Sequence, residues 1–224
     1  MIKEQLTKIK SELPSNVILV AVSKTKPKED IQEAYNAGQR IFGENRAQEL
    51  AEKAAALPED IQWHAIGNLQ RKKVKYIAPY ATMIHSVESL KLLLEINKEA
   101  KKHDRTIDCL LQFHIATESS KHGMNLEDAK ELISSSEYSE CHNVRIVGTM
   151  GMATFTDNLE QVRTEFKALK KIHTQLKESF FADNDHFTTI SMGMSGDYKI
   201  AIEEGSTMVR IGSSIFGSRS YPNA

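Results

Sequence analysis

The 224-residue sequence contains only two cysteines, Cys109 and Cys141, which form no close-spaced metal-binding or redox motif. We therefore expect a protein of the reducing cytoplasm. Long hydrophobic runs are missing too, because no apolar stretch approaches the ~18 residues of a membrane span. The first ten residues, MIKEQLTKIK, lack the hydrophobic core of a signal peptide. The sequence thus predicts neither a membrane span nor an export signal.

A strong excess of one charge sign is also absent. Lysine and arginine number 29 against 30 aspartate and glutamate residues, so the formal net charge is -1. This balance gives no electrostatic reason to expect nucleic acid or an anionic membrane surface as a partner. No Ser/Gly-rich linker divides the chain and no internal repeat is visible, so we expect one globular domain over residues 1–224.

What the sequence does contain is an alternation of short apolar runs and helical patterns. The runs are rich in β-branched residues, and several are apolar on both faces, as buried parallel strands are. The segments between them carry apolar residues at spacings of three and four, which predicts helices. The eight candidate strands are residues 17–23, 40–45, 61–67, 82–87, 107–114, 144–151, 186–193 and 207–212.

Eight strands alternating with helices predict an α/β protein with a single (β/α)8 barrel. An open doubly wound sheet is the alternative, but eight strands favour closure. Only 12 residues follow the last candidate strand, too few for a full covering helix. The amphipathic start of the chain, with Ile2, Leu6 and Ile9, predicts an extra N-terminal helix that fills part of this gap.

Two basic residues, Lys24 and Arg210, interrupt the apolar ends of the first and last candidate strands. In such barrels chemistry takes place at the carboxyl ends of the strands, and side chains alternate along each strand. If Lys24 and Arg210 point into the barrel mouth, the residues at even spacing from them line the interior and the others face the helices. The inward set is Ile18, Val20, Val22 and Met208, and the outward set is Leu19, Ala21, Val209 and Ile211.

Lys24 suggests Schiff-base chemistry. Desolvation at the mouth of an apolar barrel disfavours the ammonium form of a lysine, and the neutral amine is the form that attacks a carbonyl. The simpler alternative is that Lys24 and Arg210 only form ion pairs with Glu44 or Asp197.

Two loops with small residues, SMGMSGD and RIGSSIFG, follow the seventh and eighth candidate strands. Backbone amides in loops at these two places form the usual phosphate site of this fold. A ligand with a carbonyl and a phosphate is either pyridoxal 5′-phosphate (PLP) or the phosphorylated sugar of a Schiff-base aldolase. Arg210 favours PLP, because a guanidinium can donate a hydrogen bond to an unprotonated pyridine nitrogen.

The chain resembles the pyridoxal phosphate homeostasis protein family, whose fold is similar to the barrel domain of alanine racemase. The matching motifs are AVSKTKP, FGENRAQEL, WHAIGNLQ, IHSVES, SKHGMN, GTMGMAT and the long segment from ISMGMSGDYKIAIEEG to STMVRIGSSIFGSR. The resemblance implies that Lys24 carries PLP as a Schiff base and that Arg210 faces the pyridine nitrogen. It further implies that Ser195, Gly212 and Ser213 hold the phosphate, and that Asn45, His64 and Met194 line the cofactor face.

The resemblance also implies a function: binding, buffering and supply of PLP, without an established catalytic turnover. Expected partners are PLP and apo PLP enzymes, and we expect a monomer, with a dimer as the alternative. The competing interpretation is a PLP-dependent racemase or lyase acting on amino acids. Racemases of this fold take a second acid–base group from a further C-terminal domain, for which the chain leaves no room.

Three other features have a functional and a structural interpretation. A histidine late in a strand, such as His64, is more often a hydrogen-bonded structural residue than an acid–base group. His85 and His114 have no carboxylate or cysteine partner at metal-ligand spacing, so we expect no metal. Lys121, in the segment ESSKHG, is either a second cofactor-handling lysine or an exposed surface residue.

Overall fold

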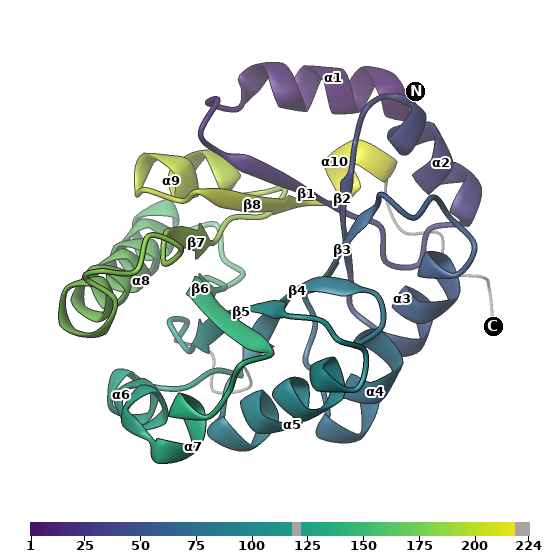
Figure 1. Ribbon diagram of the computed structural model, residues 1–224. Coiled ribbons are helices and arrows are strands. Elements are labelled where there is room, and N and C mark those ends of the chain that lie inside the picture. Colours follow the sequence, from purple (N-terminus) through teal and green to yellow (C-terminus); the bar gives the residue numbers. More distant parts are fainter. Residues whose placement is uncertain (118–121, 218–224) are drawn as a thin grey trace.

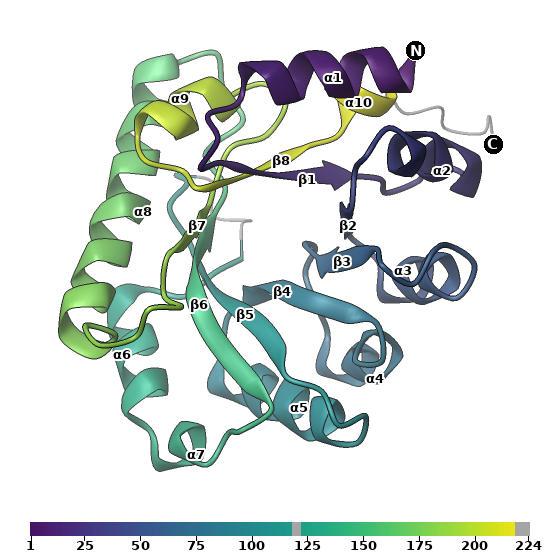
Figure 2. The ribbon, with the colours of Figure 1, turned by 45° about the horizontal axis from the view of Figure 1, so that its top comes forward.

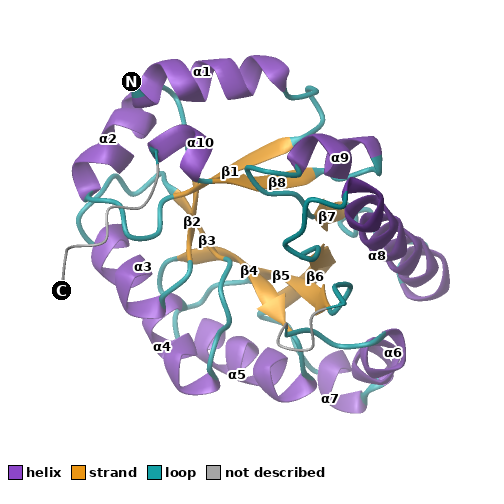
Figure 3. Ribbon diagram, turned by 180° about the vertical axis from the view of Figure 1, so that it is seen from behind, coloured by secondary structure: helices purple, strands orange, loops and turns teal. Residues whose placement is uncertain are grey.

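A computed structural model describes residues 1–117 and 122–217 of the chain, and Lys121 lies outside this described part. Eight parallel strands form a closed barrel in chain order, and β8 pairs with β1 (Figure 1). The predicted barrel is therefore confirmed, and the open sheet is wrong. Seen from behind, the strands form an inner ring that the helices surround (Figure 3).

Each strand coincides with one of the predicted apolar runs. The strands are β1 (Ile18–Val22), β2 (Ile41–Glu44), β3 (Gln62–Ala65), β4 (Ala81–Val87), β5 (Ile107–Phe113), β6 (Val144–Gly151), β7 (Thr189–Ser191) and β8 (Met208–Ile211). The α-helices are α1 (Ile2–Glu12), α2 (Lys28–Asn36), α3 (Ala47–Ala54), α4 (Val74–Ile77), α5 (Leu90–Lys101), α6 (Leu126–Ser134), α7 (Ser136–Ser139), α8 (Leu159–Phe180), α9 (Tyr198–Glu203) and α10 (Ser213–Phe216), and a short 3-10 turn, η1 (Arg71–Lys73), precedes α4. Within the described ranges, none of the helices is long and apolar enough to cross a membrane.

Helix α1 covers the part of the barrel next to α10, the short helix that follows the last strand. Helix α10 has only 4 residues, and α1 lies against it and against α2 (Figure 2). Leu6 and Ile9 are the buried residues of α1, as its amphipathic pattern predicts. The expectation of an extra N-terminal helix that fills this gap is confirmed.

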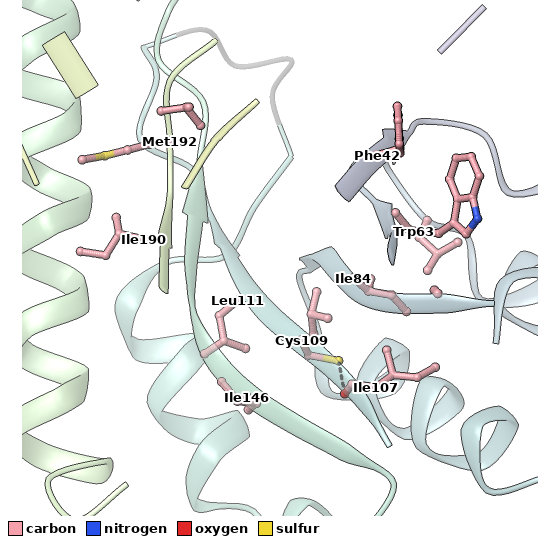
Figure 4. Close-up of a cluster of buried hydrophobic side chains, with 14 of the residues drawn as sticks. Phe42, Trp63, Ile84, Ile107, Cys109, Leu111, Ile146, Ile190 and Met192 are labelled. Carbon is pink, nitrogen blue, oxygen red and sulfur yellow. Dashed lines mark hydrogen bonds between the residues drawn. The ribbon is translucent and has the colours of Figure 1, made fainter. Parts of the chain in front are cut away.

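Two apolar layers lie on opposite faces of the strands. The layer inside the barrel consists of Val20, Met83, Leu110, Val147, Met150 and Met208. The layer between strands and helices contains Leu19, Ala21, Val209 and Ile211, and Figure 4 shows another part of it around Trp63, Ile84 and Leu111. The predicted alternation is thus confirmed for Val20 and Met208. Ile18, the first residue of β1, is 42% exposed, so it lies at the amino rim of the barrel and not in the packed inner layer.

Candidate functional site

A cavity of about 490 Å³ opens at the carboxyl ends of the strands. This volume lies within the range of sites that bind small molecules. Of the eight residues that the sequence suggests for the site, the cavity lining includes seven: Lys24, Asn45, Met194, Ser195, Arg210, Gly212 and Ser213. The eighth, His64, is not among the lining residues. Residues from the beginning and the end of the chain therefore meet at one place.

Lys24 and Asn45 occupy the ends of neighbouring strands. Lys24 lies in a turn after β1, in which the Lys26 amide donates to the Ser23 carbonyl at 3.0 Å. Asn45 directly follows β2, and Gly67 approaches it closely from the end of β3. A Cβ atom at Gly67 would lie 2.5 Å from the Asn45 carbonyl oxygen, so only glycine permits this approach.

The two small-residue loops, which follow β7 and β8, meet on the side of β1 that faces away from β2. The Gly212 amide donates to Ser195 Oγ at 3.3 Å, which joins the loop after β7 to the start of α10. A Cβ atom at Gly212 would lie 3.1 Å from the Val22 carbonyl oxygen, so this loop also packs tightly against the end of β1. Hydroxyl groups and backbone amides are the donors that anion-binding loops use.

Arg210 places a cation at the buried end of the cavity. Its side chain is 4% exposed, and it donates to Ser191 Oγ at 2.7 Å and to the Gly151 carbonyl at 3.1 Å. Burial lowers the pKa of Arg210 to about 10, and the Asp197 carboxylate opposes this shift. The guanidinium therefore remains charged at neutral pH.

Glu44, one of the two carboxylates considered as an ion-pair partner of Lys24, is bonded elsewhere. Its Oε1 accepts from Lys53 Nζ at 2.7 Å and from Ser23 Oγ at 2.6 Å. Burial raises the pKa of Glu44 to about 7, although the adjacent Lys53 opposes the shift. Residues 1–117 and 122–217 contain no group of three His, Cys, Asp or Glu side chains that could hold a metal ion.

Comparison with known proteins shows the family to which this chain is similar. The family profile described as "Alanine racemase, N-terminal domain" matches residues 1–220. A pyridoxal phosphate homeostasis protein of Aquifex aeolicus is 41% identical over 205 residues, which cover 91% of this chain and 87% of that protein. The human protein of the same name is 38% identical, with 91% and 77% of the two chains covered.

The chain belongs to the pyridoxal phosphate homeostasis protein family.

Solved structures are similar to this chain as well. PipY of Synechococcus elongatus, solved without and with PLP bound, superimposes on this homeostasis-family chain with TM-scores of 0.90 and 0.86. It is 34% identical, and the match covers 97% of this chain and 100% of PipY. An alanine racemase of Clostridium difficile, at 15% identity and a TM-score of 0.78, is similar in fold alone, and the match covers 57% of that racemase.

His64 lies deeper in the barrel of this family member than the sequence suggests. It is 3% exposed, and its Nδ1 lies 2.9 Å from His85 Nε2. Ile66, two residues further along the chain and therefore nearer the barrel mouth, lines the cavity in its place. Burial lowers the pKa of His64 to about 3 and holds that of His85 well below its usual range, so both rings are neutral. The structure agrees with the structural interpretation of His64.

Several residues that the sequence analysis did not select also line the cavity of this family member. Gln112 lies in β5 and Met152 directly follows β6, so the rule that sites form at strand ends would have found both. Asn68 Nδ2 lies 2.8 Å from His122 Nε2, which joins the segments after β3 and β5 at the cavity wall. Lys26 is a second amine in the lining, and its Nζ donates to the Phe216 carbonyl at 2.8 Å.

Proposed function

We propose that this protein binds PLP through a Schiff base at Lys24, buffers the cofactor and supplies it to apo PLP enzymes. The observation that carries the proposal is one cavity whose lining contains an amine, a buried guanidinium and two loops of small residues. The names of the relatives and the PLP-bound structure of PipY support the same cofactor.

The residues of the cavity fit the chemical groups of PLP. Lys24 would hold the aldehyde covalently, and Ser195, Gly212 and Ser213 would hold the phosphate through hydroxyls and backbone amides. Arg210 would donate a hydrogen bond to the ring nitrogen. Asn45 and Met194 would line the face of the ring.

The same residues support a carrier rather than a catalyst. PLP, when bound, supplies an electrophilic aldehyde and a conjugated ring that can accept electrons. The charged Arg210 opposes protonation of the ring nitrogen, which weakens that electron-accepting role. Asp197 and His122, acid–base side chains that line the cavity with Lys24, are already hydrogen-bonded: Asp197 Oδ1 accepts the Met194 amide at 2.5 Å, and His122 is bonded to Asn68.

The test is to mix the purified protein with PLP, reduce it with borohydride and map the modified peptide by mass spectrometry. We expect a visible absorption band that the reduction removes, and the reduced adduct on Lys24. Lys24→Ala should abolish the adduct. Lys26→Ala is the matched control, because this lysine lies in the same cavity and should leave the adduct in place. An adduct that persists in Lys24→Ala contradicts the proposal.

Turnover is tested separately, by incubating the PLP-loaded protein with amino acids in deuterated water. A carrier should leave the α-proton in place, because racemisation and lyase reactions of amino acids break or exchange bonds at that carbon. Exchange at a catalytically useful rate would instead establish the racemase or lyase interpretation. A protein that stays colourless with PLP, but is trapped by a phosphorylated sugar and borohydride, would be an aldolase.

A further inference from the structure

A buried lysine outside the cavity lining bonds to the turn that carries Lys24. Lys53 lies on α3, and its side chain is 6% exposed. Its Nζ donates to the Ser23 carbonyl at 2.8 Å, to Glu44 Oε1 at 2.7 Å and to Glu49 Oε1 at 2.7 Å. An ammonium group has three N–H donors, so these acceptors use its full capacity.

The carboxylates that Lys53 holds reach both chain neighbours of Lys24. Glu44 Oε1 accepts from Ser23 Oγ at 2.6 Å, and Glu49 Oε1 accepts the Thr25 amide at 2.7 Å. The residue before Lys24 and the residue after it are therefore tied to one charged cluster, which we call the Lys53 cluster (Lys53, Glu44 and Glu49).

The backbone conformation of the turn also indicates that its surroundings hold it in place. Thr25 has a φ of 64°, in the left-handed region that a β-branched residue rarely adopts. Such a conformation persists only where the surroundings hold it, and its amide is held by Glu49. The main chain is thus fixed on both sides of Lys24, which restricts where the amine can reach.

We propose that Lys53 is a positioning residue: it fixes the turn over residues 23–26 so that the Lys24 amine faces an aldehyde in the cavity. The inference rests on the proposed function, the Schiff base at Lys24. In that step the neutral amine adds to the aldehyde carbon, a C=N bond replaces the C=O bond and the oxygen leaves as water, with no change in oxidation state. Lys53 does not line the cavity and would act only through the main chain.

The experiment compares two ligands in wild type and Lys53→Met. PLP can form the Schiff base, whereas pyridoxine 5′-phosphate has the same ring and phosphate with an alcohol in place of the aldehyde. We expect Lys53→Met to slow Schiff-base formation about 10- to 100-fold, because misplacement of a reacting group costs this much. The dissociation constant for pyridoxine 5′-phosphate should stay as in wild type. An unchanged rate, or an equal loss for both ligands, overturns the inference.

A second pair of variants keeps the test decisive should Lys53→Met fail to fold. Glu49→Gln keeps an oxygen that accepts the Thr25 amide, and Glu49→Ala removes it. We expect Glu49→Ala to slow Schiff-base formation and Glu49→Gln to restore most of the rate. Equal rates in these two variants overturn the inference.

Lys102→Met is the matched control for charge loss, since Lys102 pairs with the buried Glu99 on α5 at 2.6 Å, away from the cavity. It should form the Schiff base at the wild-type rate. If wild type itself forms none with PLP, the proposed function has failed, and that result is visible before any variant is compared.

Discussion

Arg210 Nη1 in β8 donates a hydrogen bond at 2.7 Å to Ser191 Oγ in the neighbouring strand β7. The same oxygen lies 3.1 Å from His85 Nδ1 in β4, and His85 Nε2 lies 2.9 Å from His64 Nδ1 in β3. A buried polar chain thus connects the cavity cation to the far side of the barrel. The bonds to Ser191 Oγ and to the Gly151 carbonyl hold the Arg210 guanidinium in one orientation.

Ser191→Ala should destabilise the protein, because it leaves a buried donor of Arg210 without its acceptor. We expect the free energy of unfolding to fall by about 1–3 kcal/mol, the cost of an unsatisfied buried polar group. Urea denaturation measures this. Ser139→Ala, at an exposed serine of α7, is the control and should change stability by less than about 0.5 kcal/mol. Equal effects of the two substitutions would show that the polar chain does not stabilise the barrel.

Arg210→Gln should weaken ligand binding. A charge-assisted hydrogen bond contributes about 1.5–3 kcal/mol, so we expect affinity for pyridoxine 5′-phosphate to fall about 10- to 100-fold. This ligand cannot form a Schiff base, so fluorescence titration or calorimetry reports the non-covalent contacts alone. Unchanged affinity in a folded Arg210→Gln protein would remove Arg210 from the proposed site.

Acid should destabilise the protein through its buried histidines. Burial lowers the pKa of His64 to about 3 and that of His173 to about 4, both below the unfolded value near 6.5. Because the folded pKa is the lower one, this contribution to stability is complete above pH 6.5 and is lost as the pH falls toward the folded values. Each such histidine contributes about 1.4 kcal/mol per pH unit within that window.

The variant that tests this dependence is His173→Asn, with urea unfolding measured at several pH values between about 6.5 and 4. The slope of the free energy of unfolding against pH should decrease by the equivalent of one proton. The slope above pH 6.5 should stay as in wild type. Identical slopes in both proteins within the acid window would mean that His173 does not titrate as its burial indicates.

Gly67→Ala should destabilise the wall of the cavity. Its Cβ atom would lie 2.5 Å from the Asn45 carbonyl oxygen, so the two strand ends must separate. We expect a loss of about 1–3 kcal/mol in the free energy of unfolding, as for other overpacked sites. Gly196→Ala is the control, because a Cβ atom there meets nothing within 4 Å. A Gly67→Ala protein as stable as Gly196→Ala would contradict the close approach seen here.

The repeating pattern of the sequence by itself determined the barrel and the place of its site. Eight apolar runs separated by helical patterns lead to eight parallel strands, and their alternation separates Val20 from Leu19 and Arg210 from Val209. Strand ends gather on one rim, so Lys24, Asn45 and Gly212 come together although they are distant in the chain. These features follow from the period-two geometry of strands and from the parallel order of the sheet.

Only the tertiary structure decided how deep each polar residue lies and which charges meet. His64 is on the inward face, as the alternation requires, but the height of β3 in the barrel places it below the cavity. The bonds from Lys53 to Ser23 and Glu44 depend on how α3 lies across the turn after β1, and no sequence spacing encodes that contact. Periodicity determines the face on which a side chain lies, whereas the partners on that face are set by the packing of whole helices and strands.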